Sequence, residues 1–469
     1  MAKKTLNKVQ KKAVQAVGNP VLIFAGAGSG KTRVLTHKIA HLIEEGLFKP
    51  EEILAVTFTN KAAEEMSNRV IALLNQKNVP LNIGTFHSIC SRLLRKEIHR
   101  LGFSKDFVIY DVQDQVALIR VVMDELNIAR SFVDPRTVSN TISHYKNKML
   151  NADAAKRSAR TIMDKTICDI FKNYQIALKK NNALDFDDLL LFPLVLFEKF
   201  PDVLKKYQGK WKYVLVDEYQ DTNRPQFLFI NAIANAHNQI CVVGDDDQSI
   251  YGWRGADIRN ILDFEKTFPG CEIYKLEQNY RSTQQILNAA SAVVKNNENR
   301  ALKELKAMNG AGDKLGLLET NDEMEEADAL ISVLEKEIKM NKRTFSDFAV
   351  LYRTNAQSRA LEDSLRRNGI PYKIIGGIRF YERKEVKDLL AYLQLIVNKK
   401  DTIALRRVVN FPPRGIGLKT VDKCVQEAKK SDKELFDVLA AVENDDRIRC
   451  VVIRGASGHF MAGGDLKLF

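Results

Sequence analysis

Residues 20–32 read Pro20-Val-Leu-Ile-Phe-Ala-Gly-Ala-Gly-Ser-Gly-Lys-Thr32, and this stretch decides the fold class. The apolar run at 20–24 predicts a buried strand, and a glycine-rich turn follows it. Residues 31–45 then carry apolar side chains at helical spacing, and a second apolar run at 53–58 predicts another strand. Strand, loop, helix and strand in this order predict an α/β fold, in which helices flank a parallel sheet.

The composition sets limits on the class of protein. The 469 residues include 72 Lys and Arg against 59 Asp and Glu, a net charge of +13, and length alone suggests about three domains. Residues 1–103 hold 16 basic and 7 acidic side chains, which suits a polyanionic partner and equally an ordinary solvated face. Six scattered cysteines without a C-x-x-C pair argue against a disulfide framework or a zinc site. Without a membrane-length apolar stretch or a signal peptide, we expect a cytoplasmic protein with no membrane partner.

The rest of the chain alternates between sheet and helical patterns. Strands are predicted again at 213–216 and 240–243, after a long helical stretch that breaks at Asp134-Pro135, and also at 348–352 and 372–375. The predicted domains are residues 1–104 with 197–275 (a discontinuous α/β domain), 105–196 (a helical insertion), 276–397 (part of a second α/β domain), 398–440 (the start of a helical subdomain) and 441–469 (a tail).

The glycine-rich turn has the composition of a phosphate-binding loop. Its backbone N–H groups can point at phosphate oxygens, and the following helix adds its positive N-terminal end. Lys31 is expected to reach the β and γ phosphates of ATP, and the Thr32 hydroxyl to bind Mg²⁺. The alternative is a glycine-rich loop without a ligand. The predicted nucleotide-binding residues of the loop are Ala25, Gly26, Ala27, Gly28, Ser29, Gly30, Lys31 and Thr32.

Three later segments supply the catalytic candidates. The strand at 213–216 ends in Asp217 and Glu218, which are expected to hold Mg²⁺ and to act as general base, respectively. Gln248 follows the next strand and could contact the γ-phosphate. Arg281 is either an arginine finger or an ordinary surface salt-bridge residue.

Aromatic and polar residues gather at predicted strand ends, in residues 57–60, 84–88, 185–188 and 249–254. Single-stranded nucleic acid is bound by stacking of bases on aromatic rings together with backbone contacts. The alternative for Phe58 and Phe86 is a place in the core. Tyr251, Trp253 and Arg254 form a candidate cluster for base stacking and phosphate contact.

Residues 5 to about 435 resemble the UvrD/PcrA/Rep-type DNA helicases of superfamily 1. The resemblance rests on ordered motifs: the Gln10 segment, AGAGSGKT, TFTNKAAEEM, GTFHS, LDFDDLL, VDEYQDTN, VGDDDQSIYGWRGA, LEQNYRST and FYERKEVKDLLAYL. It implies two RecA-like domains with ATP and Mg²⁺ between them, and 3′-to-5′ movement along single-stranded DNA that unwinds single-/double-strand junctions in repair or replication. It further implies that Gln10 recognises adenine and that Arg33 and Arg281 contact the nucleotide. The DNA-binding residues that it implies are Phe58, Asn60, Thr85, His87, Phe186, Tyr251, Trp253 and Arg254. The resemblance implies no particular protein partner.

The end of the sequence departs from that resemblance. Two later helicase motifs are not found, and residues 441–469 resemble a fragment of the enoyl-CoA hydratase (crotonase) family, with Ala462 at the position of an oxyanion-hole N–H. We expect no hydratase activity, because the other catalytic groups of that family are absent. The interpretation is a truncated helicase joined near residues 439–443 to a foreign fragment; the alternative is an unusual terminus with a chance resemblance. Unwinding is then expected to be impaired, so the alternative function is an ATP- and single-stranded-DNA-binding fragment without productive turnover. A P-loop enzyme of another kind, such as a nucleotide kinase, would not need the ordered aromatic motifs.

Overall fold

The computed structural model describes residues 6–76, 79–297, 300–301, 303–375, 383–413, 416–431 and 433–441. These residues form two compact units, one from residues 1–312 and 391–469 and the other from residues 313–390. The larger unit contains the sheet, and the smaller unit is helical in its regular elements. The domain boundaries expected from the sequence stay predictions.

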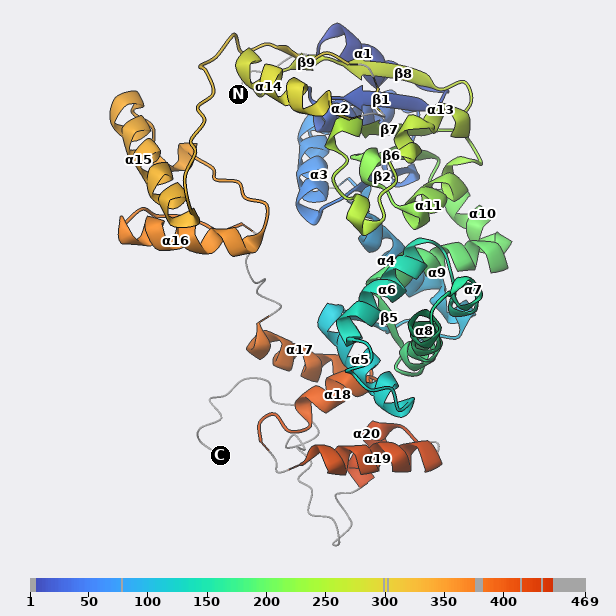
Figure 1. Ribbon diagram of the computed structural model, residues 1–469. Coiled ribbons are helices and arrows are strands. Elements are labelled where there is room, and N and C mark those ends of the chain that lie inside the picture. The colour runs from blue at the N-terminus through green and yellow to red at the C-terminus, as the bar shows by residue number, and fades with distance from the viewer. Residues whose placement is uncertain are drawn as a thin grey trace. The chain divides into compact units, whose positions relative to one another are not determined.

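The larger unit is built on one six-stranded parallel sheet with the strand order β3-β2-β6-β7-β1-β8 (Figure 1). Its strands are β1 (Val21–Ala25), β2 (Ile53–Thr57), β3 (Asn82–Thr85), β6 (Tyr213–Val216), β7 (Ile240–Gly244) and β8 (Glu272–Leu276). Two distant chain segments therefore share one sheet, and the expected α/β class with helices flanking a parallel sheet is confirmed.

The strands are buried on both faces, and alternate residues separate into two cores. Leu22 and Phe24 of β1 belong to one core, whereas Val21, Ile23 and Ala25 belong to the other. Helices α1 (Lys8–Gln15), α2 (Lys31–Glu44) and α3 (Asn60–Leu74) supply the second core, and α4 (Phe86–Glu97), α9 (Phe186–Lys199), α10 (Pro201–Lys210) and α11 (Arg224–Ala234) supply the first. A parallel sheet covered in this way gathers the carboxyl ends of its strands at one edge.

The helical insertion lies between β3 and β6 in the sequence. It contains α5 (Val112–Glu125), α6 (Pro135–Asn147), α7 (Ala152–Ser158) and α8 (Ile162–Lys180). The predicted break is confirmed, because Asp134 caps α6 by accepting hydrogen bonds from the N–H groups of Arg136 and Thr137, with Pro135 at the first helical position. The sequence did not predict the parallel strand pair β4 (Val108–Tyr110) and β5 (Ala183–Asp185), whose strands are too short to show a period.

Further elements outside the six-stranded sheet follow β7 in the chain. They are the short helices α12 (Arg259–Leu262) and α13 (Phe264–Thr267), the strand pair β9 (Gln278–Asn279) and β10 (Lys306–Ala307), and helices α14 (Gln284–Val294), α17 (Lys384–Val397, which begins in the smaller unit), α18 (Thr402–Val408), α19 (Leu418–Ser431) and α20 (Leu435–Ala441). The Tyr110 hydroxyl donates to Asp401 at 2.6 Å, so the segment before α18 is tied to the insertion.

The smaller unit consists of α15 (Glu323–Asn341), α16 (Ser358–Arg367) and extended segments around a small apolar core. The two strands predicted here are wrong: the described residues at 348–352 and 372–375 form no strand. Leu351 is 94% exposed and Ile375 is 79% exposed. A strand needs neighbours that take up its backbone hydrogen bonds, and the described part of this unit offers them none.

The described helices include none that combines the length and the apolar character of a membrane crossing. The predicted crotonase-like tail falls almost entirely on residues 442–469, including Ala462, which lie outside the described residues.

Candidate active site

The phosphate-binding loop connects β1 to α2 at the carboxyl edge of the sheet. Gly30 is the N-cap of α2 with a φ of +95°, a left-handed conformation that glycine adopts without strain. Gly28, with a φ of +70°, has a second role: a Cβ there would lie 2.6 Å from the Cβ of Arg281. The bare Cα of Gly28 therefore lets the segment that carries Arg281 contact the loop.

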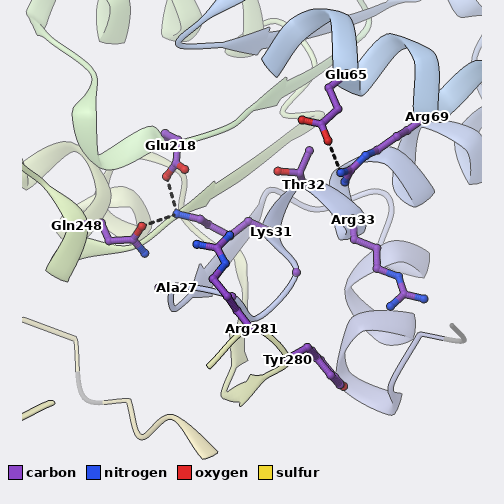
Figure 2. Close-up of a pocket in the computed structure, with 12 residues that line it drawn as sticks. Ala27, Lys31, Thr32, Arg33, Glu65, Arg69, Glu218, Gln248, Tyr280 and Arg281 are labelled. Carbon is purple, nitrogen blue, oxygen red and sulfur yellow. Dashed lines mark hydrogen bonds and ion pairs between the residues drawn. The ribbon is translucent and has the colours of Figure 1, made fainter. Parts of the chain in front are cut away.

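Three predicted catalytic side chains meet at the end of this loop. The Lys31 ammonium donates to Glu218 at 2.6 Å and to Gln248 at 3.4 Å (Figure 2). The three residues come from α2 and from the loops after β6 and β7, which are adjacent strands. The sheet topology thus brings together groups that lie far apart in the sequence.

Thr32 and Asp217 form the candidate metal site. The Thr32 hydroxyl lies 3.5 Å from Asp217 Oδ2, and Asp217 is 4% exposed. Burial and the neighbouring Glu218 raise the pKa of Asp217 to about 6. A hydroxyl and a buried carboxylate are oxygen donors of the kind that Mg²⁺ prefers, and a carboxylate whose charge is disfavoured by burial gains from a cation. The donor set therefore fits Mg²⁺.

A cavity of about 400 Å³ adjoins these residues. Its lining contains the predicted residues Ala27, Gly28, Gly30, Lys31, Thr32, Arg33, Glu218, Gln248 and Arg281. In Figure 2 the side chains of Lys31 and Arg33 extend from the start of α2 in different directions. The cavity thus brings nine of the predicted residues around one space that can take a triphosphate.

The sequence analysis missed three residues that line the same cavity: Glu65, Arg69 and Tyr280. Glu65 and Arg69 form an ion pair one turn apart on α3. Glu65 lies within the motif TFTNKAAEEM, and Arg69 follows Glu65 by four residues on the same helix, which was a usable signal. Tyr280 stands directly before Arg281 in a motif that was identified, but nothing in its residue type indicated the cavity.

Gln10 is buried at 1% exposure against the loop. Its side-chain amide donates to the Ser29 carbonyl at 2.9 Å and accepts from the Asn7 N–H at 3.0 Å. Gln10 therefore links α1 to the phosphate-binding loop, and its expected contact with adenine stays a prediction.

The segment that carries Arg281 is attached directly to the same loop. The Asn279 side chain donates to the Ala27 carbonyl at 2.5 Å, and the Tyr280 N–H donates to the Gly28 carbonyl at 3.0 Å. Arg281 is exposed and lines the cavity, so its side chain is available to a bound phosphate.

Four of the predicted DNA-binding residues form one aromatic and cationic cluster. The rings of Phe58 and Tyr251 stack with centroids 6.0 Å apart, and Tyr251 lies 6.5 Å from Trp253. The Arg254 guanidinium lies over the Trp253 ring at 4.5 Å. Trp253 is 70% exposed, which is unusual for such a large apolar side chain and typical of a stacking surface.

The other predicted DNA-binding residues lie at neighbouring strand ends. His87 and Phe186 meet edge to face at 5.6 Å, and burial lowers the pKa of His87 to about 4, so the imidazole is neutral at pH 7. Asn60 is exposed at the start of α3, whereas the Thr85 hydroxyl accepts a hydrogen bond as the cap of α4. For Phe86 the core alternative is the right one, since it is 1% exposed.

Comparisons with known proteins agree with this geometry. A family model described as the UvrD/REP helicase N-terminal domain matches residues 6–269, and one described as the UvrD-like helicase C-terminal domain matches residues 274–448. The second match continues into the stretch at 441–469, so it gives no support to a junction at 439–443 or to the crotonase-like interpretation of the tail.

Curated relatives resemble most of the chain. The ATP-dependent DNA helicase PcrA of Staphylococcus epidermidis is 46% identical over 440 residues, which cover 94% of this chain and 60% of the relative. PcrA of Bacillus subtilis is 45% identical over 438 residues, covering 93% of this chain and 59% of the relative. This chain therefore spans about 60% of the length of the curated relatives that it matches. Since the first model alone matches more than half of the residues, the chain belongs to the UvrD/REP helicase family.

Proposed function

We propose that this chain is an ATP-dependent DNA helicase or translocase that moves 3′ to 5′ along single-stranded DNA and opens single-/double-strand junctions in DNA repair or replication. One observation carries the proposal: a phosphate-sized cavity and an exposed aromatic cluster lie at the same edge of one sheet. The loop after β7 contributes Gln248 to the cavity and Tyr251, Trp253 and Arg254 to the cluster. A shift of this loop would therefore move residues of both the cavity and the aromatic cluster.

The roles of the cavity residues follow from their chemistry. Lys31, now paired with Glu218, would turn to the β and γ phosphates when ATP binds. This releases the Glu218 carboxylate to accept a proton from the attacking water. Gln248 and Arg281 would stabilise the charge that develops on the γ-phosphate.

Thr32 and Asp217 would hold Mg²⁺ through their oxygen atoms. The ion would supply charge neutralisation of the β and γ phosphates. Asp217 must be ionised for this, and its raised pKa makes nucleotide binding dependent on pH.

The aromatic cluster would bind single-stranded DNA without preference for sequence. Bases would stack on Tyr251, Trp253 and Phe186, while Arg254 would contact a phosphate. The printed name of the curated relatives, ATP-dependent DNA helicase, supports a DNA substrate. We also place the protein in the cytoplasm, because its six cysteines are scattered along the sequence and lack the spacing of a disulfide framework.

The deciding experiment measures ATP hydrolysis by the 469-residue chain with and without single-stranded DNA. We expect stimulation by DNA, and we expect Glu218→Gln to abolish hydrolysis while ATP binding remains. ATP and DNA binding without hydrolysis in the unmodified chain would instead establish the alternative, a binding fragment without turnover. Failure to bind ATP would refute both.

We retain the crotonase-like origin of residues 441–469 only as a proposal that can be tested directly. Uninterrupted sequencing reads across codons 430–450, together with the intact mass of the natural protein, would show whether this stretch is joined to the helicase part. A protein mass without it would refute the fusion.

A further inference from the structure

Three consecutive aspartates follow β7: Asp245, Asp246 and Asp247. Their carboxylates lie within 4.8 Å of one another, and the first two residues are 2% and 3% exposed. So much negative charge in so little space needs a cation. The chain supplies one, because the Lys303 ammonium lies 2.6 Å from Asp245 and 2.9 Å from Asp247 and also contacts Asp246. The Lys303 side chain is only 4% exposed.

Arg300 strengthens the same contact. Its guanidinium donates two hydrogen bonds to Asp247, at 3.1 and 2.8 Å, and the Ala301 N–H donates to Asp246 at 2.7 Å. Burial opposes ionisation of Asp247, but the bonds from Arg300 and Lys303 outweigh it and lower the pKa of Asp247. All three aspartates are thus held by Arg300, Ala301 and Lys303, which lie close together in the sequence.

The aspartates lead directly to the catalytic groups. Asp245 accepts a hydrogen bond from the Gln248 side chain, and Gln248 in turn accepts from Lys31 at 3.4 Å. Lys31 is paired with Glu218 at 2.6 Å. A continuous series of polar contacts therefore runs from Lys303 to the residue expected to bind the γ-phosphate.

The other side of Lys303 leads to the arginine-finger candidate. Lys303 stands just before β10, which pairs in parallel with β9. Strand β9 ends at Asn279, two residues before Arg281, and Asn279 donates to the carbonyl of Ala27. Because of this pairing, Arg281 and Lys303 belong to one small substructure that contacts the phosphate-binding loop at one point and the aspartates at another.

We propose that Lys303 and Arg300 are positioning residues that hold the loop of Asp245 to Gln248 in fixed register with the segment carrying Arg281. This contact fixes the positions of Gln248 and Arg281 relative to each other, so that both side chains can reach the γ-phosphate. The inference rests on the proposed ATP hydrolysis and adds to it a pair of residues that touch neither nucleotide nor DNA. Without Lys303 the three carboxylates repel one another, so the loop shifts and Gln248 loses its position.

The test uses the full chain with Lys303→Met, with Lys303→Arg as a charge-preserving rescue. Lys306→Met is the matched control, because Lys306 is a nearby lysine that is exposed in β10. Amide hydrogen exchange of peptides covering residues 244–256 reports on the loop without requiring activity. We expect faster exchange in Lys303→Met, near-normal exchange in Lys303→Arg and no change in Lys306→Met.

Steady-state kinetics then separate positioning from binding. A displacement of about 1 Å in a catalytic group lowers kcat by about 10²-fold, so we expect a loss of this order in Lys303→Met with little change in the KM for ATP. Unchanged exchange of the loop, or faster exchange with unchanged kcat, would overturn the inference. If the unmodified chain does not hydrolyse ATP, the proposed function fails, and the exchange measurement still decides on the positioning role.

A milder variant covers the case in which Lys303→Met destabilises the whole sheet. Arg300→Gln removes a partly exposed pair and leaves Lys303 in place. It should give a smaller change of the same kind, confined to the same peptides. The proposal would be refuted by normal exchange in Arg300→Gln together with exchange raised across the whole sheet in Lys303→Met. The contacts of Arg300 and Lys303 with the aspartates would then stabilise the sheet in general and would not position the loop.

Discussion

Replacing Lys146 by Met should unfold the helical insertion more easily and in a manner that depends on pH. The Lys146 ammonium lies 2.6 Å from Asp185 and 2.8 Å from Asp188, and all three side chains are at most 2% exposed. Asp185 also accepts from the Tyr174 hydroxyl at 3.0 Å. Methionine fills a similar volume but leaves two buried carboxylates without their cation.

The expected loss is large, because removing one partner of a buried ion pair costs about 3–5 kcal/mol. This is a sizeable part of a typical domain stability of about 5–15 kcal/mol. At about 2–4 °C per kcal/mol, the melting temperature should fall by about 10 °C. Lys148→Met is the control, since Lys148 is exposed just beyond α6.

The sign of the pH dependence follows from Asp188. Burial and the nearby Asp185 raise the pKa of Asp188 to about 7, and loss of Lys146 should raise it further. A carboxyl whose pKa is higher in the folded state than its unfolded value of about 4 binds more protons when folded. Stability therefore falls as pH rises through this window, and the deficit of Lys146→Met should be larger at pH 8 than at pH 5.

Urea titrations and thermal melts at both pH values measure this deficit. The reasoning would be refuted by a deficit below about 1 kcal/mol at pH 8 or by one that is equal at both pH values, since an uncompensated carboxylate cannot behave in either way. Adding Asp188→Asn to Lys146→Met removes one unpaired charge and should recover part of the stability.

Two further predictions concern the two binding sites, and a third concerns the stability of helix α1. Trp253→Ala should weaken single-stranded DNA binding by about 1–3 kcal/mol, measured by fluorescence anisotropy, and leave ATP affinity unchanged. The affinity for Mg²⁺ and ATP, measured by calorimetry, should fall below about pH 6, where Asp217 takes up a proton, and Asp217→Asn should remove this dependence. Lys38 is fully buried and donates to the carbonyl groups of Ala13 and Ala16 at the end of α1. Lys38→Met removes these hydrogen bonds and should therefore destabilise α1 by about 1–3 kcal/mol. Hydrogen exchange within α1 would show this, and exchange equal to that of the unmodified chain would contradict it.

The phosphate-binding loop and the strand that ends in Asp217 and Glu218 could be predicted because each is a local pattern. A glycine-rich turn between a buried strand and a helix has few other uses. The parallel sheet followed from the same periodicity. In the smaller unit that reasoning was wrong. The apolar run at 348–352 has the composition of a buried strand, but composition does not show whether neighbouring strands are present to pair with it.

The sequence by itself determined the chemistry of this protein: which residues can bind phosphate, hold a cation, take up a proton or stack on a base. Only the tertiary structure decided which of them act together, because a parallel sheet brings the ends of strands that are distant in the chain to one edge. It placed Lys31 beside Glu218 and Gln248, and it brought Glu65 and Arg69 into the cavity. It also set Lys303 among three aspartates, a contact that no local pattern encodes because an ordinary lysine acquires its role only from what the fold buries around it.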